Sequence, residues 1–121
     1  MKIHESGENY LETILVLKNR LGNVRSIDIV NEMEFSKPSV SVVVKQFREN
    51  GYITVDEKGY ITLTDAGMEI AQRVYERHTV LTKALIALGV CEETAKEDAC
   101  RIEHDISEET FDRIKTHLKL D

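Results

Sequence analysis

The chain has 121 residues, of which 41% are hydrophobic and 31% are charged, and 16 Lys and Arg against 22 Asp and Glu leave a net charge of −6. This length suits one compact unit or two very small ones, and the apolar content argues against intrinsic disorder. No apolar run approaches the roughly 18 residues of a membrane span, there is no signal-peptide pattern, and the two cysteines are typical of reduced thiols, so we expect a cytoplasmic protein with no membrane partner.

Three helices are predicted in the first half of the chain. Apolar residues at 3–4 spacing predict a helix from Glu5 to about Arg20, whose inner stripe is Tyr10, Ile14, Leu17 and Leu21. Ser26 is expected to cap a short helix whose inner residues are Ile27, Val30 and Met33. Ser36 and Pro38 suit the N-cap and first turn of a third helix, which buries Val40, Val43, Val44 and Phe47 and ends at Gly51.

A β-hairpin and three more helices are predicted to follow. The β-branched and aromatic runs 52–55 and 60–63 flank a turn that contains Lys58-Gly59. Thr64 or Asp65 then caps a long helix with an inner stripe of Ile70, Val74, Leu81, Leu85 and Leu88. A fifth helix covers about Glu92 to Asp105, and a sixth opens at Ser107 with Phe111, Ile114 and Leu118 inward. This order predicts a mainly α protein, with a winged helix-turn-helix domain at 1–63 and a helical domain at 64–121.

The outward face of the third helix is the candidate DNA-reading surface. A recognition helix carries small, polar and basic residues outside, because serines bond to phosphates or bases and lysines neutralise phosphates. The candidate DNA-binding residues, with the tip of the wing included, are Ser36, Lys37, Pro38, Ser39, Ser41, Val42, Lys45, Gln46 and Lys58. The acidic net charge counts against DNA binding, but residues 1–63 hold eight Lys and Arg against nine Asp and Glu, so most of the excess acid lies in 64–121. The alternative is a helical protein whose exposed serines and lysines are only solvated surface.

A second constellation has the composition of a metal site. Cys100, Glu103 and His104 are spaced i, i+3 and i+4, which places a thiolate, a carboxylate and an imidazole on one face of the predicted fifth helix. Further ligands are offered by His78 on the long helix and by Glu8, Asn9 and Glu12 on the first. The alternatives are a chance cluster of a buried Cys, a solvated Glu and a capping His, or a nucleophilic cysteine with a histidine base. The enzyme alternative is disfavoured because no oxyanion loop or phosphate cradle is visible.

The whole chain resembles the iron- and manganese-dependent repressors, the diphtheria toxin repressor and manganese transport regulator family, in its short form without an SH3-like domain. The segments that carry the resemblance are 8–12 in the first helix, 37–41 at the third helix, 63–67 after the wing, Arg77-His78, and 97–104. The resemblance implies a homodimeric, metal-activated repressor that controls metal homeostasis, binds operator DNA through 1–63, and dimerises and holds metal through 64–121. The metal ligands that it implies are Glu12, His78, Cys100, Glu103, His104 and Asn9.

The resemblance also bears on which metal is bound. Cys100 matches the cysteine of the iron branch, and a thiolate suits Fe²⁺, whereas Glu12 matches a carboxylate of the manganese branch. We expect Fe²⁺ first and Mn²⁺ second. Thr82 and Lys96 stand where the iron branch has ancillary ligands, so a second site is expected to be altered or absent. Val42 replaces a base-proximal glutamine, so the operator sequence does not carry over.

The expected mechanism is a metal-linked switch. An ion that joins ligands of the first helix to those of the fourth and fifth would set the recognition helices of a dimer at about 34 Å, the spacing of successive major grooves. The alternative is a winged-helix regulator that responds to an organic ligand or to oxidation of Cys100.

Overall fold

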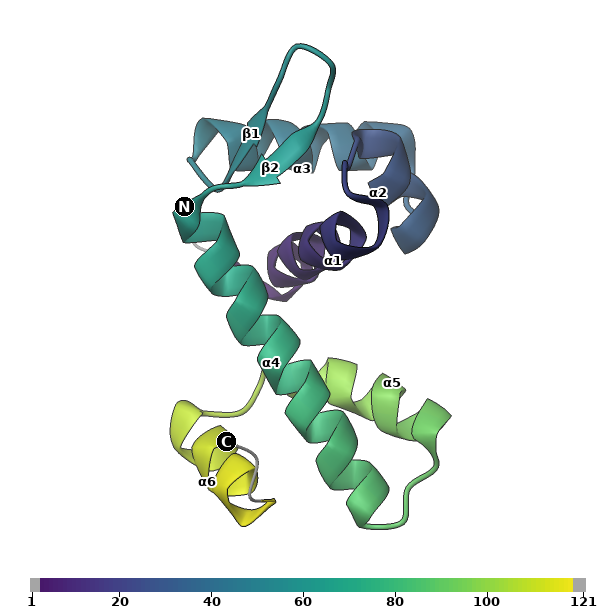
Figure 1. The fold of residues 1–121 in the computed structure, drawn as a ribbon, viewed down its shortest axis with the longest axis vertical. Coiled ribbons are helices and arrows are strands. Elements are labelled where there is room, and N and C mark those ends of the chain that lie inside the picture. Colours follow the sequence, from purple (N-terminus) through teal and green to yellow (C-terminus); the bar gives the residue numbers. More distant parts are fainter. Residues whose placement is uncertain (1–2, 119–121) are drawn as a thin grey trace. The chain divides into compact units, whose positions relative to one another are not determined.

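The computed structural model describes residues 3–118, which form helices and one small sheet (Figure 1). The elements are α1 (Glu5–Leu21), α2 (Ser26–Met33), α3 (Lys37–Glu49), β1 (Ile53–Val55), β2 (Ile61–Leu63), α4 (Asp65–Ala87), α5 (Glu92–Ile102) and α6 (Glu108–His117). This confirms the predicted mainly α fold. Contacts divide the chain into two compact units, one up to Gln72 and one from Arg73, so α4 contributes to both. Among the described helices, none combines the length and apolar character that a membrane crossing requires.

The core of the first unit is built on the inner faces of α1, α2 and α3. Tyr10, Ile14 and Leu17 of the predicted α1 stripe are buried, but Leu21 at the last turn is 50% exposed, so its prediction was wrong. On α2 the prediction of Ile27 was also wrong. Ile29, on the opposite side of this short helix, takes the buried position, and Ile27 is left 43% exposed.

Local hydrogen bonds begin the helices of this unit. Ser36 Oγ accepts from Ser39 N at 3.3 Å, which confirms the predicted cap of α3. Ser26 is the first residue of α2 rather than its cap, and the N–H of Arg25 donates instead to Asp28 Oδ2 at 2.8 Å. Phe47 of α3 packs edge-on against Tyr10 at a ring-centroid distance of 6.4 Å, which joins α3 to α1.

The hairpin is a short antiparallel pair with Ile53 opposite Leu63. Its strands omit residues 52 and 60 of the predicted runs. Asp56 organises the turn, since its Oδ1 accepts from the N–H groups of Lys58 and Tyr60, both at 2.9 Å. Ile61 N also donates to Val24 O at 2.7 Å, an additional bridge that the sequence did not indicate.

The start of α4 is packed closely on the hairpin. Thr64 Oγ1 accepts from Gly67 N at 3.3 Å and donates to Gly51 O at 2.6 Å, so the predicted cap is confirmed and also ties the helix to the preceding loop. A Cβ atom on Gly67 would lie 2.1 Å from the carbonyl oxygen of Tyr52. Only glycine allows this approach of the helix to the backbone.

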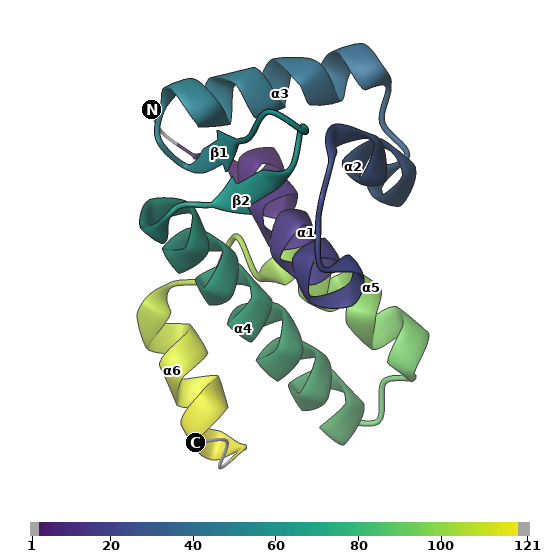
Figure 2. The ribbon, with the colours of Figure 1, turned by 45° about the horizontal axis from the view of Figure 1, so that its top comes forward.

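In the second unit, α5 and α6 lie on either side of the C-terminal half of α4 (Figures 1 and 2). Its buried apolar residues include Val80, Leu81, Ala95, Ala99 and Phe111. Ser107 Oγ accepts from Thr110 N at 3.1 Å and caps α6, the helix that was predicted to open at this residue. The prediction for α5 was wrong at its end, because the helix stops at Ile102 and residues 103–105 form a turn instead of continuing to Asp105.

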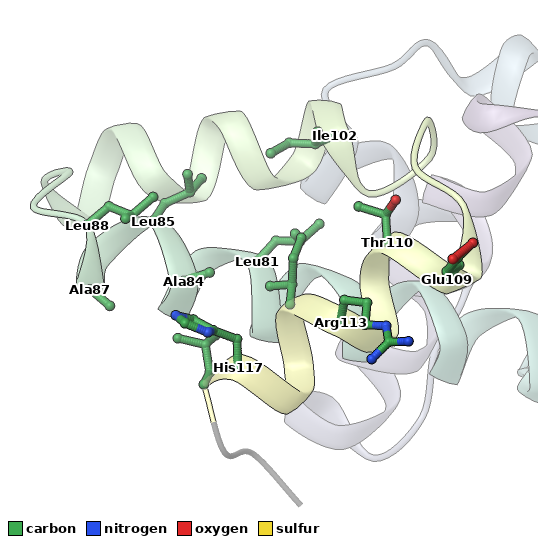
Figure 3. A pocket seen from close by; sticks show the side chains of 12 residues that line it. Leu81, Ala84, Leu85, Ala87, Leu88, Ile102, Glu109, Thr110, Arg113 and His117 are labelled. Carbon is green, nitrogen blue, oxygen red and sulfur yellow. The ribbon is translucent and has the colours of Figure 1, made fainter.

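An apolar groove lies between the C-terminal half of α4, the end of α5 and α6 (Figure 3). It encloses about 720 Å³ and is lined by Leu81, Leu85, Leu88 and Ile102, with Arg113 and His117 among the residues of α6. Leu88 was predicted to be in the inner stripe of α4 but is 80% exposed. This leucine is therefore part of an open apolar surface and not of the core.

Candidate metal centre and DNA-binding surface

Three of the predicted metal ligands meet within the second unit. His78 extends from α4, Glu103 is the C-cap of α5, and His104 follows it in the turn. His78 Nδ1 lies 3.0 Å from Glu103 Oε2, and His104 Nε2 lies 3.4 Å from Glu103 Oε1. The carboxylate therefore stands between two imidazoles, one of which, His78, lies 25 residues before Glu103 in the sequence.

The Glu103 side chain is buried with an incomplete set of hydrogen bonds. The side chain is 0% exposed, and among the described residues its Oε1 is the buried side-chain oxygen that has no hydrogen-bond partner. Leaving a buried acceptor unsatisfied costs about 1–3 kcal/mol, and more for a charged group. A carboxylate oxygen and an imidazole nitrogen are ligands of divalent transition-metal ions, so Glu103 and His78 fit such an ion.

The predicted geometry of this cluster needs a correction. We expected Cys100, Glu103 and His104 to point from one face of a continuous helix. Because α5 ends at Ile102, Glu103 and His104 belong to the cap and the turn, although Glu103 keeps helical angles (φ −58°, ψ −23°) and donates its N–H to Ala99 O. The turn places Glu103 beside His78 and His104 beside Glu103, while half-buried Cys100 stays on the last turn of α5.

The remaining predicted ligands belong to the first unit. Asn9 and Glu12 lie on α1, and both are partly buried. Their roles as ligands, like that of Cys100, stay predictions.

The candidate DNA-binding residues form an exposed surface of the first unit. All nine predicted positions are exposed, and Val42 reaches 56%. Figure 2 shows α3 along one edge of this unit, with α2 at its N-terminal end and the hairpin beside it. Lysines at 37, 45 and 58 give the surface positive charge, which suits phosphate contacts.

One basic residue beside the wing, Arg25, is not among the positions predicted from the sequence. The guanidinium of exposed Arg25 lies 4.6 Å from the ring centroid of Tyr60. Its cation–π geometry holds a positive charge next to the hairpin. The contact joins positions far apart in the sequence, and no local pattern indicates it.

These features together define a metal-responsive DNA-binding regulator. They are a helix-turn-helix with a wing, an exposed polar recognition helix, and a histidine–carboxylate cluster in a helical second unit. Comparison with known families agrees. Residues 2–61 match the model for the iron dependent repressor, N-terminal DNA binding domain, and residues 64–120 match that for the iron dependent repressor, metal binding and dimerisation domain. The chain belongs to the iron-dependent repressor family, which confirms the resemblance and the predicted class of function.

Individual relatives give the same picture. An uncharacterized HTH-type transcriptional regulator of Methanocaldococcus jannaschii is 30% identical over 117 residues, which cover 95% of this chain and 94% of that protein. The transcriptional regulator MntR of Escherichia coli is 33% identical over 108 residues, which cover 89% of this chain and 70% of MntR.

Solved structures share the fold. A manganese-dependent transcriptional repressor in complex with manganese has a TM-score of 0.84 at 25% identity, covering 94% of this chain and 53% of that one. The manganese regulator SloR has a TM-score of 0.82 at 25% identity, covering 100% of this chain and 56% of SloR. This chain thus spans little more than half the length of these two proteins.

Proposed function

We propose that this chain is a cytoplasmic transcriptional repressor that binds operator DNA as a homodimer when a divalent transition metal occupies the cluster of His78, Glu103 and His104. Buried Glu103, held between two imidazoles with one oxygen unsatisfied, is the observation that carries the proposal. The regulators among its relatives support DNA binding rather than catalysis as the activity. We assign DNA binding to residues 1–63 and metal binding and dimerisation to 64–121.

The proposed ligand set takes residues from both units. Asn9 and Glu12 would add an amide and a carboxylate oxygen from α1, and Cys100 would add a thiolate from α5. A bound cation supplies positive charge to carboxylates that repel one another without it. Because α1 belongs to the DNA-binding unit, a ligand on it would make the orientation of the recognition helix depend on metal occupancy.

The donor chemistry favours two ions. A Cys100 thiolate favours Fe²⁺, whereas a Glu12 carboxylate and the manganese regulators among the relatives favour Mn²⁺. We propose Fe²⁺ first and Mn²⁺ second. Replacing the soft ligand by a hard one in Cys100→Asp is expected to raise the affinity for Mn²⁺ relative to Fe²⁺, measured by anaerobic competition between the two ions. An unchanged ratio would remove Cys100 from the ligand set.

The groove of the second unit is the proposed dimer face. The matched family domain is one of dimerisation, and the groove combines an apolar lining, which includes half-buried Ile102, with exposed Leu88. A surface of this kind is buried in stable homodimers. A second copy of the same helices is the occupant that fits.

The test measures DNA binding as a function of metal. Duplexes selected from a random library in the presence of Mn²⁺ or Fe²⁺ under anaerobic conditions serve as probes, and affinity is measured by fluorescence anisotropy with and without each ion. Metal is expected to tighten binding by about tenfold or more, a normal size for coupled sites. Glu103→Gln should lose this gain, whereas replacing the exposed carboxylate of α5 in Glu97→Gln should keep it. Equal binding with and without metal would refute the proposal.

A further inference from the structure

Arg77 is a nearly buried arginine that the metal site as proposed does not use. It lies on α4 immediately before His78 and is only 9% exposed. Its Nη1 donates to Glu103 O at 3.0 Å and to Ile106 O at 2.9 Å. One guanidinium nitrogen therefore holds both ends of the turn that connects α5 to α6.

The contacts of Arg77 have a clear local role in this turn. The last carbonyl groups of a helix have no partner within the helix, and a cation near them also interacts favourably with the helix dipole. Arg77 meets this need at the end of α5 from a different helix. Its guanidinium carbon also lies 5.4 Å from the ring centroid of Phe111 on α6, so the one side chain joins α4, α5 and α6.

Arg77 also lines a polar pocket of about 190 Å³, together with Arg73, Glu76, Glu108 and Asp112.

We infer that Arg77 is a positioning residue of the metal site. By bonding to the main chain of Glu103, it fixes the direction in which that carboxylate leaves the end of α5, between His78 and His104. Neighbouring residues of α4 thus supply one ligand, His78, and the anchor for the turn that carries Glu103 and His104. Partners of this kind typically change metal affinity by about 10–100-fold when they are removed.

The inference rests on the proposed metal site, and its test separates the two. Arg77→Gln removes the charge and the fork of donors, and Arg77→Lys keeps the charge with a single nitrogen. Arg101→Gln is the matched control, because this arginine of α5 is 75% exposed and pairs with Asp98. Mn²⁺ affinity is measured by electron paramagnetic resonance, coordination geometry by the visible spectrum of Co²⁺ at saturation, and apo stability by urea unfolding.

Arg77→Gln is expected to bind Mn²⁺ about tenfold or more weakly and to change the Co²⁺ spectrum, with Arg77→Lys in between and Arg101→Gln like wild type. If Arg77→Gln lowers the urea midpoint while metal affinity and spectrum stay those of wild type, Arg77 is a structural residue only and the inference is wrong. Arg77→Lys decides the question in the same way if Arg77→Gln does not fold. Wild-type protein that binds neither Mn²⁺ nor Co²⁺ would instead overturn the proposed function itself.

Discussion

Exchanging Glu103 for Gln should reverse the order of stability between wild type and variant when metal is added. In the apo protein, Glu103 is a buried carboxylate whose Oε1 has no hydrogen-bond partner. Gln has the same shape, carries no charge, and brings an amide that can donate to a neutral imidazole such as His78 at the 3.0 Å contact. Removing the buried charge of Glu103, one of whose oxygens has no hydrogen bond, should therefore leave the apo free energy of unfolding unchanged or raise it by about 1–3 kcal/mol.

Metal should stabilise wild type much more than Glu103→Gln. A ligand that binds only the folded state at about 100 times its dissociation constant stabilises that state by about 2.7 kcal/mol. Wild type should gain this amount from Mn²⁺ or Fe²⁺, and Glu103→Gln should gain little because it has lost the central ligand. The curves of stability against metal concentration are expected to cross.

Urea unfolding followed by circular dichroism measures the effect, at one fixed protein concentration because dimerisation also contributes to stability. The reasoning is refuted if apo Glu103→Gln is less stable than apo wild type by more than about 2 kcal/mol, since a buried charge paired for structural reasons loses that much when one partner is removed. It is also refuted if the variant is stabilised by metal as strongly as wild type.

Three further predictions concern other parts of the molecule. Gly67→Ala should lower the free energy of unfolding by about 2 kcal/mol or more in urea, instead of the gain of about 1 kcal/mol usual in a helix, because its Cβ would meet the Tyr52 carbonyl at 2.1 Å. Leu88→Glu should raise the dimer dissociation constant about tenfold or more in analytical ultracentrifugation, with an unchanged helical spectrum, since it places a charge in the proposed dimer face. The hydrogen bond to Thr94 lowers the pKa of the exposed Cys91 thiol, so the pH midpoint of its reaction with iodoacetamide should rise in Thr94→Val, and an unchanged midpoint would contradict this.

Sequence patterns predicted the parts of the fold that depend on neighbouring residues. The cap at Ser36 was predicted correctly, and Thr64 was one of the two caps predicted for α4, because a capping side chain bonds to an N–H within a few residues along the chain. Periodicity located the helices, but it failed for Ile27 and Leu88, whose exposure depends on which face of the helix finds a partner. Hydrophobicity alone does not distinguish a core face from an interaction surface.

For the metal site, the kinds of donor and the elements that carry them could be predicted from the spacing of Glu103 and His104 and from the presence of His78 on the long helix. The burial of Glu103 between the two imidazoles and the bonds of Arg77 to the turn became visible only in the folded structure. These contacts join residues 25, 26 and 29 positions apart, across separate helices. Local periodicity and capping extend over a few residues, whereas burial and distant hydrogen bonds arise only when helices pack together.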